Sequence, residues 1–207
     1  ASLPDIMGGP QGLTRTLISL SPEDQIFLIE ALGPRLAEVV HEASFLRDIF
    51  ATMAVAEVEL KMLDNLGGPG LRALIHTAEE LGEVLEWLYG ECDRRAVELL
   101  GDDYLKRLMR QALDLCLVLH ALNAGGQSDL LSRIGWEHAR ILVRDGVDLA
   151  HLLRALPHEL SEQLISGMDK KQLVALIGNA KDWQYLWQRL EPAEMEMLAG
   201  KLGVSRA

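Results

Sequence analysis

Aromatic residues are scarce in this chain of 207 residues, since phenylalanine, tryptophan and tyrosine together make up 5% of it. A hydrophobic core must therefore be built from aliphatic side chains, and the leucine and alanine that dominate the sequence both favour helix. Segments that alternate strictly between apolar and polar residues, as half-buried strands do, are also lacking. We therefore predict an all-α fold.

Positive charge is in short supply as well. The chain has 20 Lys and Arg against 31 Asp and Glu, a formal net charge of −11. Nucleic-acid phosphates and anionic membrane surfaces require a basic protein surface, so we expect neither as a partner. The imbalance lies in residues 1–99, with 7 basic and 17 acidic side chains, whereas residues 100–207 have 13 and 14. A solvated surface explains this surplus, and attraction of a basic partner is the alternative.

Cysteines and long apolar runs are nearly absent. Cys92 and Cys116 are too few for a disulfide framework and are not spaced as a metal site, so we predict buried free thiols. No apolar run reaches the roughly 18 residues of a membrane span. The start, "ASLPDIMGGPQG", lacks the basic and apolar regions of a signal peptide. These features favour a cytoplasmic setting without membrane insertion.

An apolar residue followed by glycine recurs along the chain at a fixed interval. These apolar anchors stand 34 residues apart at Leu32, Leu66, Leu100, Ile134, Met168 and Leu202. Glycine follows every anchor except Met168, where Asp169 stands instead. Twelve residues after an anchor the side chain is always small, at Ser44, Ala78, Ala112, Gly146 and Ala180. A constant interval without insertions indicates an internal repeat.

Within one interval the apolar spacing is helical. In the last interval Trp183, Leu186 and Leu190 follow the pattern i, i+3, i+7. Pro22 and Pro192 suit the first turn of a helix, where the missing N–H has no effect. The recurring glycine suits the position after a helix, where φ is positive. We therefore predict two or three short helices in each unit, the last of them ended by the glycine.

Such short helices are marginally stable alone, so each unit must bury its apolar face against the next. This predicts an α-solenoid of about five 34-residue repeats. We expect a loose lead-in over residues 1–12 and a single helical-repeat domain over residues 13–207. The domain would comprise a partial unit 13–31, full units 32–65, 66–99, 100–133, 134–167 and 168–201, and a tail 202–207.

The stretch "LSPEDQIFLIEALGPRLAEVV" resembles the short-helix superhelix of the flagellar motor switch protein FliG and of the N-domain of the MgtE magnesium transporter. Those families repeat Leu-x-Pro-Glu, a Leu-Leu pair and a further Leu. The matching residues are Leu20, Pro22, Glu23, Leu28, Ile29 and Leu32, and again Leu190, Pro192, Glu194, Leu198 and Leu202. The resemblance implies an architecture and a scaffold or sensor role, and it brings no catalytic residue.

Two other repeat families share the 34-residue length. The tetratricopeptide pattern is not supplied by the columns of this chain. The stretch "KQLVALIGNAKDWQYLWQRL" resembles a DNA-binding repeat of TAL effectors, but that family places Gly-Gly-Lys-Gln against the phosphates. The matching positions here are Lys181, Asp182, Trp183 and Gln184. A TAL-like nucleic-acid-binding protein is therefore a remote alternative.

Residues arranged for catalysis are not evident. The six histidines form no HExxH motif and no His/Cys pair at ligand spacing, and a break near Pro157 is expected to separate His151 from His158. The "GGPG" of residues 67–70 lacks the Lys-Ser/Thr of a phosphate loop and predicts a turn. We expect no catalytic, cofactor-binding or metal-binding residues and a non-enzymatic protein. An enzyme would need carboxylates that converge from different repeats.

The predicted function is a protein–protein interaction scaffold or adaptor of a bacterial-type cytoplasmic system. Its expected partner is a protein or a basic peptide segment, and the end repeats could pair in a homodimer. The candidate partner-binding residues are Glu79, Glu80, Glu83, Trp136, Trp183 and Trp187. Trp136 follows a helix-ending glycine and is expected to be partly exposed. The columns of Trp183 and Trp187 favour core packing, with an end cover or a partner seat as the alternative.

The alternative function is a regulatory domain that senses a ligand or a divalent cation, which would stiffen the stack. The acidic residues Asp102 and Asp103, or Glu79 and Glu80, could touch a cation. The helix macrodipole explains acidic residues at helix starts equally well, and we prefer that interpretation.

Overall fold

The computed structural model describes residues 8–178 and 180–203, and all secondary structure in these ranges is helical. The predicted all-α class is therefore confirmed. By its internal contacts the chain divides into two compact units, residues 1–108 and 109–207, termed here the N-terminal and the C-terminal unit. Among the described helices, none combines the length and the apolar character that crossing a bilayer requires.

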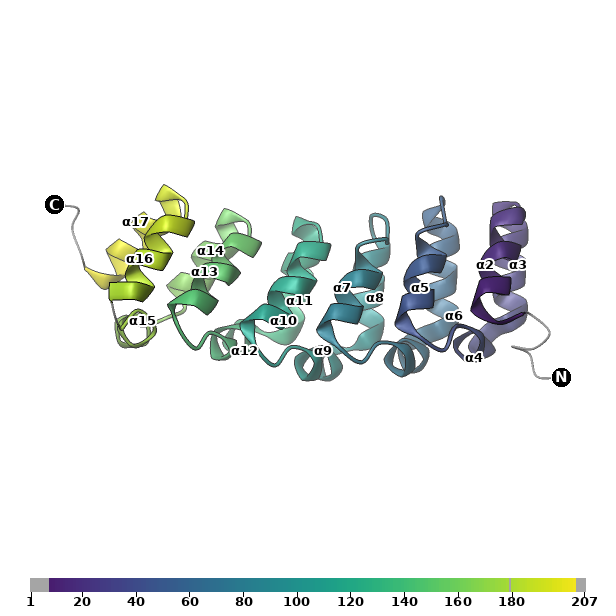
Figure 1. The fold of residues 1–207 in the computed structure, drawn as a ribbon, viewed down its shortest axis with the longest axis horizontal. Coiled ribbons are helices and arrows are strands. Elements are labelled where there is room, and N and C mark those ends of the chain that lie inside the picture. The colour runs from purple at the N-terminus through teal and green to yellow at the C-terminus, as the bar shows by residue number, and fades with distance from the viewer. Residues whose placement is uncertain (1–7, 179, 204–207) are drawn as a thin grey trace. The chain divides into compact units, whose positions relative to one another are not determined.

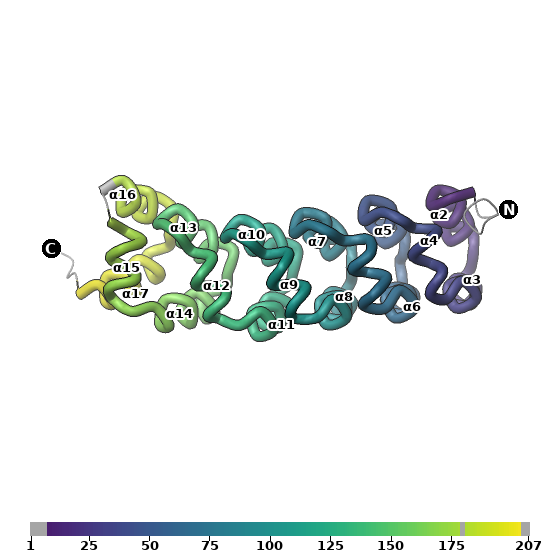
Figure 2. The backbone as a smooth tube through the Cα atoms, turned by 90° about the horizontal axis from the view of Figure 1, so that it is seen from below, coloured from purple at the N-terminus to yellow at the C-terminus, as the bar shows by residue number. Residues whose placement is uncertain are grey.

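The N-terminal unit consists of antiparallel helix pairs joined by shorter helical segments (Figure 1). Its helices are α2 (Gly9–Ser19), α3 (Pro22–Leu32), η1 (Gly33–Arg35), α4 (Leu36–Val40), α5 (Ala43–Phe50), α6 (Ala56–Leu74), α7 (Ala78–Leu85), α8 (Cys92–Leu100) and α9 (Asp102–Leu108). Helices α2, α5 and α7 form one row and α3, α6 and α8 a second row (Figure 2). Helix α5 packs against α7, and α6 packs against both α3 and α8.

The C-terminal unit has its own two rows of helices (Figure 2). Its helices are α10 (Ala112–Ala121), α11 (Ala124–Ile134), α12 (Trp136–Leu142), α13 (Gly146–Ala155), α14 (His158–Ser166), α15 (Lys170–Leu176), α16 (Ala180–Arg189) and α17 (Pro192–Leu202). Helix α13 packs between α10 and α16, and α14 packs against α17. The predicted break between His151 and His158 is present, since α13 ends at Ala155 and Pro157 precedes α14.

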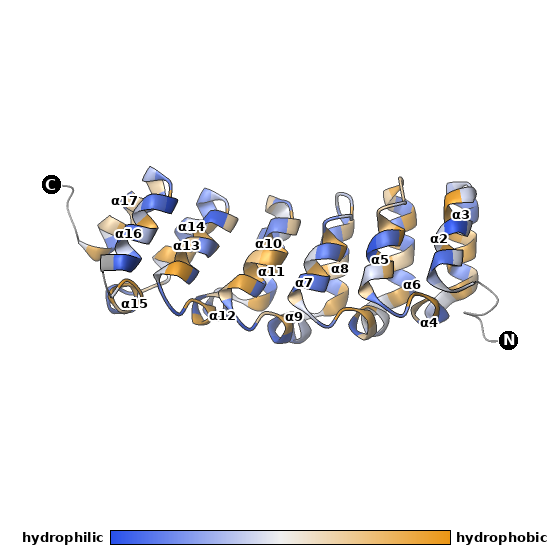
Figure 3. Cartoon of the chain, viewed as in Figure 1, coloured by the Kyte–Doolittle hydropathy of each residue, from blue (hydrophilic) through white to orange (hydrophobic). Residues whose placement is uncertain are grey.

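Both units are built on aliphatic cores, as the composition predicts. Phe50 is the one aromatic side chain among the buried core residues of the described chain, and leucine is the commonest of them. Each helix carries both hydrophobic and hydrophilic residues (Figure 3). The apolar side chains fill the space between neighbouring helices, which stabilises helices that are too short to persist alone.

The recurring glycines adopt the conformation that the sequence predicts for them. Gly33, Gly67, Gly101, Gly135 and Gly203 have φ values of 52°, 58°, 80°, 81° and 72°. A residue with a Cβ is strained at such φ values, whereas glycine is not. The exception in the sequence, Asp169, has φ −82° and instead begins α15, where its side chain accepts a hydrogen bond from the backbone N–H of Gln172. The glycines therefore end one helix and turn the chain into the next.

The segment around Gly67 is more compact than the predicted turn over residues 67–70. Only Gly67 leaves the helical conformation, and helical structure continues on both sides of it within α6. Pro69 is accommodated because it lies in the first turn after the break, where its missing N–H removes no hydrogen bond. The "GGPG" stretch is thus a one-residue kink followed directly by helix.

The helical chain also begins earlier than predicted. Residues 1–7 of the expected lead-in lie outside the described residues, but α2 begins at Gly9 rather than at residue 13. Gly8 has φ 68° and leads into the helix, and Pro10 occupies its first turn, where its fixed φ is favourable. The glycine and proline that suggested an irregular segment therefore start a helix.

Hydrogen bonds at equal sequence separations tie short helices to the segment before them. In the N-terminal unit Tyr104 of α9 donates its hydroxyl to the carbonyl oxygen of Ile75, at 2.6 Å. In the C-terminal unit the Nε2 atom of His138 of α12 lies 3.2 Å from the carbonyl oxygen of Met109. Both contacts join residues 29 positions apart. Each contact satisfies a carbonyl group just beyond the end of a helix.

Glycine is also required where two helices approach closely. A Cβ at Gly68 would overlap the carbonyl oxygen of Leu99 and lie 2.8 Å from the Arg72 guanidinium. A Cβ at Gly146 would lie 2.8 Å from the Cβ of Asp182. Gly146 belongs to the column of small residues, and its lack of a side chain lets α13 approach α16.

We predict that Gly68→Ala lowers the free energy of unfolding by about 2 kcal/mol, because the methyl group would push α6 away from α8. Gly200→Ala is the matched control, since Gly200 lies inside α17 and its Cβ would meet no atom within 4 Å. That change should stabilise the protein by about 0.5–1 kcal/mol, through the lower entropy of the unfolded chain. Urea denaturation followed by circular dichroism measures both. Equal stability of the two variants would contradict the close contact.

Candidate functional site

An acidic stripe lies along α7 of the N-terminal unit. It consists of Glu79, Glu83 and Glu86, which are spaced at i, i+4 and i+7 and so share one side of the helix. Glu79 and Glu86 are exposed, whereas Leu81 and Leu85 on the other side of α7 are buried. The stripe is therefore left over once α7 has packed into its unit.

Two exposed aromatic side chains follow the acidic stripe directly. Trp87 is 42% exposed and Tyr89 is 58% exposed. Both lie in the segment between α7 and α8. Large aromatic side chains rarely remain this exposed in a chain whose core is short of them, and they are enriched in protein interfaces. Sequence reasoning did not select these two residues, because their positions fall between the apolar columns.

Glu80 is not part of the acidic stripe, although it was predicted as a partner-binding residue together with Glu79 and Glu83. It forms a capping box with Thr77 at the start of α7. Its Oε2 atom accepts hydrogen bonds from the backbone N–H groups of His76, at 2.6 Å, and Thr77, at 3.0 Å. The Glu80 carboxylate therefore stabilises the helix start, which agrees with the macrodipole interpretation.

Glu83 is engaged by a neighbouring helix. Arg47 of α5 donates from Nη1 to Glu83 Oε2 at 2.9 Å, and from Nη2 to Asp48 at 2.8 Å. These two carboxylates, Asp48 most strongly, raise the pKa of the Arg47 guanidinium. All three side chains are substantially exposed, so solvent screens the pair and it adds little stability. Glu79 and Glu86 remain as the stripe members for which the described residues provide no ion pair.

The three predicted tryptophans all belong to the C-terminal unit. Trp136 begins α12 and is half-buried, which fits the predicted partial exposure. Trp183 is half-buried as well and lines a hollow of about 330 Å³ with Val174, Ile177 and Leu202. The predicted acidic residues and the predicted tryptophans lie in different units, so the structure does not combine them within one unit.

The predicted core position of Trp187 is wrong, because its side chain is 58% exposed. Leu119 and Leu153 occupy the same column and are buried. Leu119 lies on α10, which packs against α13, and Leu153 lies on α13, which packs against α16. Among the described helices, α16 has no further helix of this row packed against it, so the same position is left open there.

A hollow that the sequence did not predict lies on the α10, α13 and α16 side of the C-terminal unit. It has a volume of about 290 Å³. It is lined by Leu113, Cys116, Leu117, His120, His151, Arg154 and Arg189, and is termed here the basic hollow. The lining combines apolar side chains with two guanidinium and two imidazole groups, and it includes no carboxylate.

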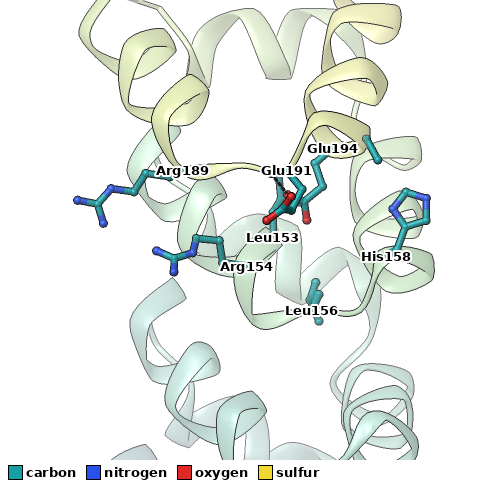
Figure 4. Close-up of a pocket in the computed structure, with 8 residues that line it drawn as sticks. Leu153, Arg154, Leu156, His158, Arg189, Glu191 and Glu194 are labelled. Atoms are coloured by element: carbon teal, nitrogen blue, oxygen red, sulfur yellow. Dashed lines mark hydrogen bonds between the residues drawn. The ribbon is translucent and has the colours of Figure 1, made fainter.

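Arg154 and Arg189 also border a second hollow of about 300 Å³, shown in Figure 4. The two arginines extend along one side of this hollow, Glu191 and Glu194 project into its centre, and His158 lies on the far side. Because Glu191 and Glu194 form a capping box at the start of α17, each carboxylate accepts a hydrogen bond from the backbone of the other. Burial raises the pKa of Glu194 despite the hydrogen bond from the Glu191 N–H.

Tyr185 holds two side chains of the basic hollow in place. Its hydroxyl lies 2.9 Å from the Nε2 atom of His151, and the guanidinium of Arg189 lies 4.6 Å from the centre of its ring. The first contact is a hydrogen bond and the second a cation–π interaction. One aromatic ring therefore orients a histidine from α13 and an arginine from α16.

The two cysteines are buried free thiols, as predicted. Burial raises the pKa of each to about 12, with Glu59 adding to the effect at Cys92. Thiols with such pKa values are protonated at neutral pH, and the thiolate is the form that reacts. Cys116 therefore contributes an inert, weakly polar surface to the basic hollow.

A column of polar residues was missed at the sequence level, although its interval is the same 34 residues. The column consists of Gln25, Glu59, Asp93, Gln127 and Ser161. Gln25, Gln127 and Ser161 each donate to the carbonyl group eight residues earlier, at 2.7, 2.7 and 3.2 Å. These carbonyl groups lie near the C-terminal end of the preceding helix, where no intrahelical partner exists. The column is thus structural, and an interval search that included polar residues would have found it.

Glu59 is the fully buried member of this column. Its Oε2 atom accepts a hydrogen bond from the backbone N–H of Tyr89 at 3.0 Å, whereas Oε1 has no hydrogen-bond partner. The burial of the carboxyl group raises its pKa above the ordinary value, and the Tyr89 N–H offsets this in part. An ionised Glu59 therefore lowers the stability of the fold.

No group of three or more His, Cys, Asp or Glu side chains that could hold a metal ion occurs in residues 8–178 and 180–203. No protein-family model, curated protein or solved structure matches the chain. The acidic stripe and the basic hollow are therefore the two surfaces from which a function can be argued.

We predict that Glu59→Gln removes part of the pH dependence of stability. In the unfolded chain Glu59 loses its proton near its ordinary pKa of 4.5, and in the fold it does so at higher pH. The folded state binds more protons in this window, so unfolding becomes easier as the pH rises through it. Urea denaturation from about pH 4 to pH 7 should show a flatter profile for Glu59→Gln than for the unchanged protein. The exposed Glu57, on the same helix, provides the control Glu57→Gln, and an equal flattening there would contradict the assignment.

Proposed function

We propose that the protein is a non-enzymatic interaction scaffold built as an α-solenoid of 34-residue units, and that its acidic stripe binds a basic peptide segment of a partner protein. Three helix starts of the C-terminal unit, Ala112, Gly146 and Ala180, are 34 residues apart, which supports the repeat. The equal 29-residue separation of the Tyr104 and His138 hydrogen bonds supports it as well. The resemblance to the FliG and MgtE superhelix agrees with this role.

The observation that carries the partner assignment is the exposed stripe on α7. Glu79 and Glu86 face solvent next to Trp87, and no described cation pairs with them. A lysine or arginine of a partner would meet carboxylates, and it would also meet the face of an exposed indole. Cation–π contacts with tryptophan stabilise such side chains by about 0.5–1 kcal/mol at exposed sites.

The geometry of the stripe suits an extended or helical segment rather than a small molecule. Its residues span two turns of one helix and line no hollow, whereas small-molecule sites are concave. Binding to such a surface depends on several weak contacts along the segment. No observation in the described part of the chain favours the cation-sensing alternative over this one.

We expect a fluorescein-labelled peptide of alternating lysine and leucine to bind the protein in fluorescence anisotropy at low salt. Glu79→Gln combined with Glu86→Gln should weaken binding by about tenfold, since it removes two attractive charges. Raising the ionic strength should weaken the binding to the unchanged protein, because exposed charges are screened. Trp87→Ala should weaken it further.

The matched control combines Glu38→Gln with Glu57→Gln, two exposed glutamates of the same unit away from α7. It changes the net charge equally, so it separates the stripe from the overall acidity of the unit. If both double variants bind the peptide with the same affinity, the stripe is not the binding surface.

A further inference from the structure

The basic hollow is not used by the function proposed above. His120, His151, Arg154 and Arg189 converge on it from three helices, and no carboxylate lines it. A guanidinium group is charged at every pH that a protein tolerates. The hollow therefore presents permanent positive charge on a chain whose formal net charge is −11.

The helix macrodipole accounts for part of this arrangement. His120, Arg154 and Arg189 lie in the last turns of α10, α13 and α16, where cationic side chains are favourable. The macrodipole does not account for Leu113 and Leu117, which line the same hollow and are 50% and 40% exposed. The hollow therefore joins an apolar patch to a pair of arginines.

The charges nearest to the two arginines are already committed. Glu191 and Glu194 border the neighbouring hollow, where Figure 4 shows their carboxylates turned to its centre and the arginines along one side. Both carboxylates accept capping-box hydrogen bonds, and neither forms an ion pair with Arg154 or Arg189 in the described structure. The guanidinium groups thus remain available to a carboxylate from outside the chain.

The basic hollow is also ordered in advance. Tyr185 contacts both His151 and Arg189, so these side chains lose little conformational freedom when a ligand binds. The volume of about 290 Å³ lies at the lower limit for small-molecule pockets, so the hollow accommodates one or two side chains. A polyanion such as nucleic acid requires an extended basic surface, and residues 100–207 carry 13 basic and 14 acidic side chains.

We infer that the basic hollow binds an acidic peptide segment of a second partner protein. A carboxylate of this segment is held by Arg154 and Arg189, and an adjacent apolar side chain packs on Leu113 and Leu117. The inference rests on the proposed scaffold role and deepens it. The two surfaces select partners of opposite charge, the acidic stripe a basic segment and the basic hollow an acidic one.

The test measures the anisotropy of a fluorescein-labelled peptide of alternating glutamate and leucine. Arg154→Gln combined with Arg189→Gln should weaken its binding by at least about tenfold. Leu117→Ala should weaken binding about threefold, because it removes apolar contact without changing charge. The matched control combines Lys170→Gln with Lys171→Gln, two exposed lysines of α15 that line none of these hollows, and it should bind as the unchanged protein does.

Competition separates the two sources of a carboxylate. Unlabelled Glu-Leu peptide should displace the probe, whereas octanoate, a small carboxylate with an apolar chain, should displace it only at concentrations at least about a hundredfold higher. Equal displacement by octanoate would overturn the assignment to a peptide. Equal loss of binding in the arginine and the lysine variants would overturn the assignment to the hollow.

Circular dichroism and thermal unfolding of each variant establish that the fold is retained, and Leu117→Ala tests the hollow without altering its arginines. If the Glu-Leu peptide does not bind while the Lys-Leu peptide does, this inference fails and the proposed scaffold function stands. If neither peptide binds, both fail.

Discussion

The burial of aliphatic side chains between neighbouring short helices is the interaction on which the rest of the structure depends. Helices of 5 to 11 residues make up most of both units, and such segments are marginal in water without tertiary contacts. Leu81 of α7 and Leu149 of α13 are fully buried because each helix has a neighbour to cover it. Packing consumes one side of each helix and leaves the opposite side free to vary in charge. The acidic stripe and the basic hollow both occupy that free side.

Sequence reasoning predicted the features that follow from local chemistry. The helical class followed from leucine, alanine and the spacing of apolar residues, and the positive φ of Gly33, Gly101 and Gly135 followed from the need to end a helix. The start at Gly9 was missed because glycine and proline were taken as signs of irregular chain. Proline in a first turn starts a helix as readily as it ends one, and only the packing of the residues after it decides between the two.

The interaction surfaces were harder to predict, because exposure depends on which helix has a neighbour. Trp187 shares a column with buried leucines and is exposed only because of where α16 lies in its unit. Glu80 differs from Glu79 by one position and belongs to a capping box, which becomes evident once Thr77 is seen to precede the helix. The basic hollow collects residues from three helices, and no single stretch of sequence carries its signature. Intervals of 34 residues do relate Leu117, His151 and Tyr185, but the pairing of their chemistry is visible only in three dimensions.

The buried amide of Gln127 has a consequence for how the chain can change in length. Its Nε2 atom donates both to the carbonyl of Leu119, at 2.7 Å, and to that of Ala155, at 3.2 Å, so one side chain closes the ends of two helices that belong to successive hairpins. A single inserted residue between these points would rotate one helix by about 100° and leave a buried carbonyl without its donor. Exposed side chains can thus be exchanged freely, while additions or deletions inside a hairpin disturb the register of the next. Growth or shortening of such a chain is tolerated best in whole hairpins.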